Sequence, residues 1–227
     1  MDGVNVIRDN KKAATHADIL FITVKPNVVK RVIHKIRDTI SSSTLVVSVA
    51  ACVDFALLSR YFGKKKVKLI RIMPNIPVAE RKGVIGVIVN SYVTSKERKM
   101  IMDFLQPLGL TIDCKSEEHL DKLSLISGCG PAVVGYLIQT LKEESTHLGF
   151  TPHQAETIAL KTFEGTIAHM KAANISPRQL VSSVATPGGI TERIIDTLSL
   201  KYPQLLRKSL RKGYDRITKV SKTLKEI

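Results

Sequence analysis

The chain has 227 residues, 44% of them hydrophobic, and its 35 Lys and Arg residues against 20 Asp and Glu residues give a formal net charge of +15. This length and composition suffice for one large domain, or two modest ones, with a real core. No apolar run approaches the roughly 20 residues of a membrane helix, and the start lacks the basic and apolar stretches of a signal peptide, so we expect neither.

The first half alternates short apolar runs with helical stretches. We expect strands at residues 19–24, 45–49, 67–73, 84–89 and 111–114, and helices at 27–40, 54–62 and 95–108. Continuous apolar strands that alternate with helices indicate a mostly parallel sheet covered on both faces. The sequence therefore predicts an α/β fold, with the sheet in a first domain of residues 1–115.

The second half shows only helical patterns. We expect helices at residues 118–127, 132–148, 152–173, 190–200 and 204–224. These helices predict an all-α domain over residues 116–227. Because one copy of the chain can hardly bury so many apolar helix faces, we expect an obligate homodimer or a higher homo-oligomer.

Two glycine-proline turns interrupt the second half, at residues 127–132 (SGCGPA) and 186–191 (TPGGIT). Glycines let the backbone approach a ligand closely, and the first N–H groups of the following helix have no partner within it. The second turn therefore suits an anion. A single turn of this kind is usually an ordinary helix start, but two in one chain, each beside hydroxyl groups, favour a pocket for a small carboxylate.

These turns resemble the signatures of the pyrroline-5-carboxylate reductase family. The family pattern Glu-x-x-x-Asp-x-x-x-x-x-Ser-Gly-x-Gly-Pro-Ala fits residues 117–132, with Glu117 and Asp121 in place. The later pattern Ser-Pro-Gly-Gly-x-Thr fits residues 186–191. The order and spacing of the two agree, and the resemblance extends over nearly the whole chain from about Asp18 onward.

The resemblance implies an oxidoreductase that reduces the cyclic imine Δ1-pyrroline-5-carboxylate to L-proline with NADPH or NADH, the last step of proline biosynthesis. It implies that Thr191 is the catalytic residue, its hydroxyl holding the ring nitrogen. It implies that Thr186, Gly188, Gly189, Ile190 and Thr191 bind the substrate, with the N–H groups of Gly189, Ile190 and Thr191 on its carboxylate. Thr186 stands where the family usually has Ser, and Ile190 replaces a small residue or Thr.

The resemblance also places a cofactor site at the strand ends, where open α/β sheets bind ligands. The cofactor-binding residues that it implies are Val24, Lys25, Pro26, Ala50, Ala51 and Asn75. Cys52 stands where the family usually has Gly, which leaves the local turn geometry open. Family dimers interleave their all-α halves, with each active site built from both subunits.

A Gly-x-Gly-x-x-Gly turn between a strand and a helix is missing before Asp18. By comparison with the family, we expect the first domain to be an incomplete Rossmann-like domain that lacks the first βαβ unit. A misassigned start, a truncation and a real loss all remain open. The preference between NADPH and NADH, and the activity of this chain, depend on that part.

The three cysteines are widely spaced and show no metal-ligand pairing, so we expect reduced thiols, a cytoplasmic protein and no metal site. Basic residues are densest between Lys201 and Lys225. They fit a solvated helix face, attraction of anionic ligands, or nucleic-acid binding. Nucleic acid is the least expected partner, because the aromatic content is only 5% and Trp is absent.

Three functional hypotheses remain open from the sequence. The leading one is a pyrroline-5-carboxylate reductase. The second is a non-catalytic relative that keeps the dimer core and the carboxylate pocket but holds no dinucleotide. The third is a basic nucleic-acid-binding protein. A related imine or β-hydroxyacid reductase is a further enzyme alternative, against which the Ser-Gly-x-Gly-Pro-Ala segment argues.

Overall fold

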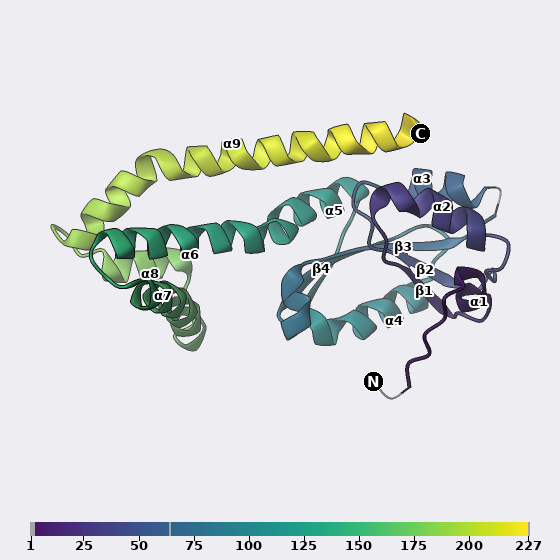
Figure 1. Cartoon of the computed structure of the whole chain (residues 1–227), viewed down its shortest axis with the longest axis horizontal. Coiled ribbons are helices and arrows are strands. Elements are labelled where there is room, and N and C mark those ends of the chain that lie inside the picture. The colour runs from purple at the N-terminus through teal and green to yellow at the C-terminus, as the bar shows by residue number, and fades with distance from the viewer. Residues whose placement is uncertain (1–2, 64, 227) are drawn as a thin grey trace. The chain divides into compact units, whose positions relative to one another are not determined.

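The computed structural model describes residues 3–63 and 65–226 and divides the chain into two compact units (Figure 1). The first unit comprises Met1–Cys129 together with Lys212–Ile227, and the second comprises Gly130–Arg211. The domain boundary that we expected from the sequence, after residue 115, lies within the first unit. A helix that follows that boundary, and the end of the last helix, belong with the sheet.

The first unit is built on a five-stranded sheet in the spatial order β1-β2-β3-β4-β5. The strands are β1 (Ile19–Ile22), β2 (Leu45–Ser48), β3 (Lys68–Pro74), β4 (Gly83–Val89) and β5 (Gly109–Asp113). The β3–β4 pair is antiparallel and the other three pairs are parallel. The predicted mostly parallel sheet is thus confirmed. The reversal of β4 follows from a connection to β3 that is too short for a parallel crossover.

Helices cover both faces of this sheet (Figure 1). They are α1 (Asn10–Thr15), α2 (Pro26–Ile36), α3 (Phe55–Phe62), α4 (Ser95–Leu105) and α5 (Glu117–Leu123), with short 3₁₀ helices at Ile76–Glu80 and Gln106–Leu108. Buried residues of α2 and α3 form one core cluster with Val46 and Leu69. Buried residues of α4 form another with Val47 and Ile70. The side chains of successive strand residues thus pack into core clusters on opposite faces of the sheet, as expected for a pleated strand.

α5 packs against β4 on a third, smaller cluster. Leu120 of α5 is fully buried there. A Cβ atom at Gly86 of β4 would lie 2.5 Å from the Leu120 Cδ1 atom and 2.8 Å from the Leu123 Cδ2 atom. The glycine therefore lets α5 approach the strand closely, and this fixes the first residues of the SGCGPA segment against the sheet.

The second unit is helical, as the sequence predicts. Its helices are α6 (Gly130–His147), α7 (Pro152–Ala172), α8 (Pro177–Val184) and the first part of α9 (Ile190–Glu226). α6 and α7 pack together, and Ala155 and Ala159 of α7 are fully buried. Capping boxes start α7 at Thr151 and α8 at Ser176.

Two details differ from the expected helices. Residues Ser124–Gly128 form a π-helical turn between α5 and α6, where we expected a helix that runs to residue 127 and is followed by the glycine-proline turn. α9 continues through Pro203, although we expected separate helices at residues 190–200 and 204–224. A proline removes one helical hydrogen bond without necessarily ending the helix.

Candidate active site

The structure brings all six predicted cofactor residues to one edge of the sheet. Val24, Lys25 and Pro26 follow β1, Ala50 and Ala51 follow β2, and Asn75 follows β3. Because β1, β2 and β3 are parallel neighbours, their carboxyl ends meet at the same edge. We call these three loops the cofactor edge.

The loop after β2 contains the departure from the family pattern. Ala50 is buried, and its N–H donates to the Ser48 hydroxyl at 3.3 Å. Cys52 has a φ of 64°, in the left-handed region that favours glycine. The backbone of this turn therefore keeps the geometry expected for the family's glycine, and a cysteine adopts it.

Asn75 connects three parts of the first unit. Its side-chain oxygen accepts the Val84 N–H at 2.8 Å, and its side-chain nitrogen donates to the Ser127 carbonyl at 3.0 Å. The Ser127 hydroxyl in turn donates to the Leu123 carbonyl at 2.8 Å. Asn75 thus ties the SGCGPA segment to the cofactor edge, a link that the sequence did not indicate.

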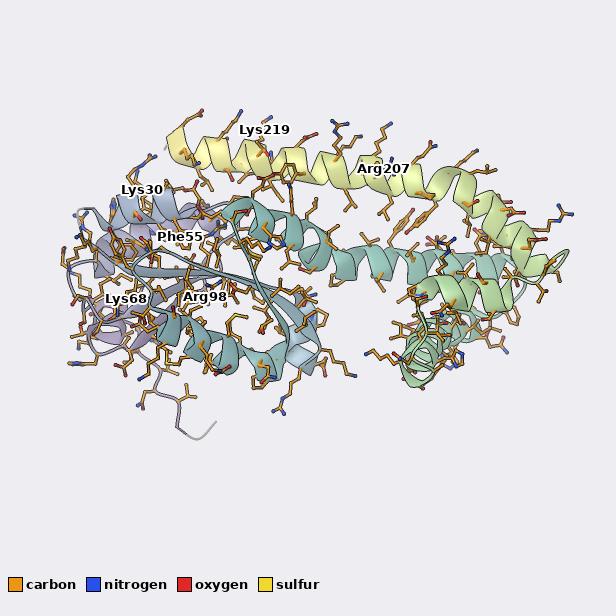
Figure 2. The ribbon with its side chains drawn as sticks, turned by 180° about the vertical axis from the view of Figure 1, so that it is seen from behind. Lys30, Phe55, Lys68, Arg98, Arg207 and Lys219 are labelled. Carbon is orange, nitrogen blue, oxygen red and sulfur yellow. The ribbon has the colours of Figure 1, made fainter. Side chains whose placement is uncertain are left out.

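A buried ion-pair cluster lies next to this edge. Arg71 of β3 is only 1% exposed and donates from Nη1 to Glu117 Oε1 at 2.6 Å and from Nη2 to Asp121 Oδ1 at 3.5 Å. The same Glu117 oxygen accepts the Phe55 N–H at 2.8 Å. The cluster therefore joins β3, α5 and the start of α3, whose first residue is labelled in Figure 2.

From the sequence we identified Glu117 and Asp121 only as motif residues and missed this role. Two signals pointed to it. A charged residue in a buried apolar strand, as in the run KLIRIMP, needs partners. Two carboxylates four residues apart lie on one face of a helix and can serve one cation. Together they indicate an Arg71 pair with both acids.

A pocket of about 300 Å³ opens beside this cluster. Its lining includes Cys52, Asp54, Arg71, Asp121, Ser221 and Lys225. Burial raises the pKa of Asp121, although the Arg71 charge opposes the shift. Burial acts in the same direction on Asp54, but hydrogen bonds from the Lys225 ammonium group and the Leu57 N–H outweigh it and lower the pKa. Asp54 is therefore held ionised.

The predicted substrate residues form the turn between α8 and α9 in the second unit. Gly188 has a φ of 75°, so the turn needs glycine there. The Gly189 N–H donates to the Thr186 carbonyl at 2.9 Å. A Cβ atom at Gly189 would lie 2.7 Å from the Thr186 hydroxyl oxygen. The turn is thus closed on Thr186 and leaves no room for a side chain at Gly189.

We call residues 186–191 the substrate turn, and α9 begins at its end. Ile190 is 83% exposed and Thr191 is half-buried, and their N–H groups belong to the first helical turn, which has no acceptors within the helix. Glu192, which we did not single out from the sequence, accepts the Gly188 N–H at 2.7 Å through Oε2. An acidic residue in the first turn is a common helix-start signal and could have drawn attention to it.

The cofactor edge and the substrate turn belong to different units. Within the described residues there is no group of three or more His, Cys, Asp or Glu side chains that could hold a metal ion. The three cysteines are free thiols.

Apolar side chains lie exposed on the helices of the second unit. Examples are Val134, Tyr136, Ile158, Val184, Ile194 and Leu198. By length and composition alone, the helical stretch Glu117–His147, in which a window of 18 residues has a mean hydropathy of 1.3, could cross a membrane. We expected no such stretch from the sequence. A single one is weak evidence for a membrane helix, since a face covered by another protein has the same composition.

Two family models match the chain. The model for pyrroline-5-carboxylate reductase dimerisation matches residues 117–223, from α5 almost to the end of α9. The model described as NADP oxidoreductase coenzyme F420-dependent matches residues 2–52, which include two of the three loops of the cofactor edge. The dimerisation match covers the helices with exposed apolar side chains and supports homo-oligomerisation.

Individual proteins are similar over most of their length. The chain is 31% identical to the pyrroline-5-carboxylate reductase of Aquifex aeolicus over 189 residues, 83% of this chain and 69% of that protein. The solved pyrroline-5-carboxylate reductase from Coxiella burnetii has 30% identity and a TM-score of 0.83, with 98% of this chain and 81% of that chain covered.

A second solved structure, Plasmodium falciparum pyrroline carboxylate reductase with NADP bound, has 25% identity and a TM-score of 0.83. It covers 97% of this chain, which spans 82% of that one. The similarity thus includes both units of the fold, the cofactor edge and the substrate turn. The chain belongs to the pyrroline-5-carboxylate reductase family.

Proposed function

We propose that this protein reduces Δ1-pyrroline-5-carboxylate to L-proline with NADPH or NADH, as the last step of proline biosynthesis. The observation that carries the proposal is the substrate turn, residues 186–191, whose closed glycine backbone leads directly into α9. The turn occurs in a member of the family that also has the cofactor edge. Membership of the family supports the reaction, and the substrate turn contains the residues that we propose for it.

The cofactor edge fits the nicotinamide end of a dinucleotide. Ala50 and Ala51 have small side chains, and Cys52 beside them adopts the left-handed turn. Val24, Lys25, Pro26 and Asn75 flank these residues at the ends of the neighbouring strands. Among residues 3–63 and 65–226, no strand leads through a Gly-x-Gly-x-x-Gly turn into a helix. We therefore assign pyrophosphate binding to none of the described residues.

The substrate carboxylate binds at the start of α9. The N–H groups of Ile190 and Thr191 lie at the positive end of the helix dipole, which favours an anion. From the sequence we assigned the Gly189 N–H to the same carboxylate, but in this structure that group donates to the Thr186 carbonyl. Gly188 and Gly189 thus shape the turn, and the Thr186 hydroxyl borders the carboxylate.

The Thr191 hydroxyl holds the ring nitrogen of the substrate by a hydrogen bond and thereby orients the imine carbon. When bound, the nicotinamide cofactor supplies the hydride that reduces this carbon. Since a protonated imine is already a good electrophile, the chain needs to position it more than to activate it. Misplacement by about 1 Å lowers such a rate by about a hundredfold.

The oligomer is proposed to be a homodimer or a larger assembly, with each active site built from both subunits as in the family. Free thiols at Cys52, Cys114 and Cys129 fit a cytoplasmic protein. The reaction needs no metal and no nucleic acid. A membrane partner is not part of the proposal, because a second copy accounts for the apolar helix faces.

Isotope transfer tests the reaction and the role of Thr191 together. The purified chain is incubated with pyrroline-5-carboxylate and NADPH or NADH carrying deuterium at the transferable position. We expect L-proline that is one mass unit heavier, formed with about a hundredfold lower kcat/KM by Thr191→Ala. Unlabelled proline would count against hydride transfer from the labelled cofactor position, and no proline from a folded oligomer would favour the non-catalytic relative.

A further inference from the structure

The end of α9 belongs to the first unit. Residues 220–226, which we call the C-terminal strap, contain two apolar side chains that pack on the core between the sheet and α2 and α3. Leu224 is only 9% exposed, and Val220 is partly buried against the same cluster. The strap is therefore anchored by hydrophobic contacts to the body that contains the cofactor edge.

Polar groups of the strap contact the loop after β2. The Ser221 hydroxyl donates to the Cys52 carbonyl at 3.4 Å. The Lys225 ammonium group lies 2.5 Å from Asp54 Oδ2, and the Lys225 carbonyl accepts from Arg60 Nη1 at 3.0 Å. The strap thus binds this loop at Cys52 and again two residues later, at the N-cap of α3.

The loop that it binds has an unfavourable backbone. Cys52 has a φ of 64°, and residues with a Cβ atom adopt that region rarely because the side chain approaches the backbone. Where glycine occupies such a position, no restraint is needed. Here the Cys52 side chain packs against the core and its carbonyl is held by the strap. Both contacts favour the left-handed turn over an extended alternative.

We propose that the C-terminal strap is a positioning device for the cofactor edge: it holds Cys52 in the left-handed turn and so keeps Ala50 and Ala51 in the shape that binds the nicotinamide cofactor. Ser221 and Lys225 are its positioning residues. The part that concerns the cofactor rests on the proposed function. The part that concerns the loop does not, because the contacts exist in the chain alone.

The size of the effect follows from a population argument. If the loop leaves its binding shape for part of the time, the measured dissociation constant rises by the inverse of the competent fraction. Lys225 and Asp54 are partly exposed, and pairs of this kind are worth up to about a fivefold change in an equilibrium. We therefore expect a moderate loss of affinity and no loss of folding.

The test compares two lysines on the same helix. Ser221→Ala with Lys225→Met removes the polar contacts of the strap but keeps Val220 and Leu224 in the core. Lys219→Met, at an exposed position on α9 (Figure 2), makes the same charge change outside the strap. The two readouts are the dissociation constant for NADPH, from its fluorescence, and the hydrogen exchange of residues 50–54, from mass spectrometry.

We expect the double variant to bind NADPH about fivefold more weakly and to exchange faster at residues 50–54, while Lys219→Met changes neither. Cys52→Gly is expected to make the loop independent of the strap, so adding the double substitution to it changes affinity by less than about twofold. Unchanged exchange in the double variant would overturn the proposal. An equal loss of affinity with and without the Cys52→Gly substitution would overturn it too.

The unsubstituted chain separates this inference from the proposed function. If it binds no NADPH, the cofactor assignment fails, and the exchange experiment still decides the strap. Faster exchange in the double variant would then support the positioning of the loop, and unchanged exchange would refute it.

Discussion

At the scale of single residues, the guanidinium of Arg71 is a buried charge, with its side chain only 1% exposed. Its two carboxylate partners come from α5, and within the described residues its Nε atom has no hydrogen-bond partner. A buried charge is tolerated only when it is paired. Glu117 therefore matters for stability through Arg71, and a change there is expected to affect the whole unit.

Glu117→Gln is expected to lower the free energy of unfolding by about 3 kcal/mol, because it removes a charge that compensates buried Arg71. The amide oxygen still accepts the Phe55 N–H, so the loss reports the ion pair. Glu118→Gln is the matched control, since Glu118 forms an exposed pair with Lys122. Urea unfolding measures both variants, and equal losses would contradict the assigned role of Glu117.

Glu192, in the first turn of α9, contacts the substrate turn at Gly188, and we assigned it no role from the sequence. Glu192→Ala removes the acceptor of the Gly188 N–H, which is worth about 1 kcal/mol. We expect the KM for pyrroline-5-carboxylate to rise about fivefold, while the KM for NADPH stays constant because the cofactor edge lies in the other unit. Glu192→Gln is expected to retain most of the affinity.

Steady-state kinetics of these variants need one control on the same helix. Asp196→Ala removes an exposed carboxylate one turn further along α9. If it raises the KM for the imine as much as Glu192→Ala does, the effect is one of general charge and the contact with Gly188 is not responsible.

At the scale of elements, Asp54 caps α3 and contacts the C-terminal strap. Its pKa lies below the ordinary value of 3.8, because hydrogen bonds from Lys225 and the Leu57 N–H outweigh the effect of burial. The folded chain thus binds fewer protons here than the unfolded chain. Asp54 contributes stability above pH 3.8, which is lost as the pH falls through the lowered pKa.

Asp54→Asn tests this pH dependence while keeping a residue that can cap a helix. At pH 7 we expect the variant to be less stable than the unsubstituted chain by about 1 kcal/mol. The difference is expected to shrink as unfolding is measured at successively lower pH below about 4. A difference that stays constant with pH would show that the charge of Asp54 is not the stabilising feature.

The sequence predicted elements better than the contacts between them. Runs such as LVVS and KLIRIMP identify strands because β-branched and apolar residues suit a sheet buried on both faces. The direction of β4 depends on how short its connection from β3 is, which a list of strands does not express. Pro203 suggested a break between two helices, but α9 continues through it from Ile190 to Glu226.

The glycine pattern predicted the substrate turn, and the resemblance to the family implied the cofactor loops. Both assignments stay predictions. Arg71, by contrast, lies 46 positions before Glu117 and 50 before Asp121, and it meets them only through the packing of α5 on the sheet. The contact between Ser221 and Cys52 spans 169 positions, so no local pattern contains it.

At the scale of the whole molecule, the exposed apolar side chains of the second unit need a partner. Ile190, Ile194 and Leu198 follow one another at intervals of four residues along α9 and are all more than half exposed. Such spacing makes a continuous apolar stripe on one helix face. The family match over residues 117–223 makes a second copy of the chain the expected partner.

Leu198→Glu is expected to weaken that assembly, because it places a charge in the apolar stripe. Light scattering with size-exclusion chromatography should give at least twice the chain mass of 25.1 kDa for the unsubstituted protein and a value near the chain mass for the variant. Ser199→Glu is the control at the next position. A monomeric unsubstituted protein, or an unchanged mass in Leu198→Glu, would contradict this prediction.

The most direct measurement is the loss of absorbance at about 340 nm, where reduced nicotinamides absorb, when the purified chain is mixed with pyrroline-5-carboxylate and NADPH or NADH. We expect a decrease that depends on the imine, with one L-proline formed for each reduced nicotinamide consumed. A folded, oligomeric protein that consumes neither cofactor in the presence of the imine would contradict the reductase.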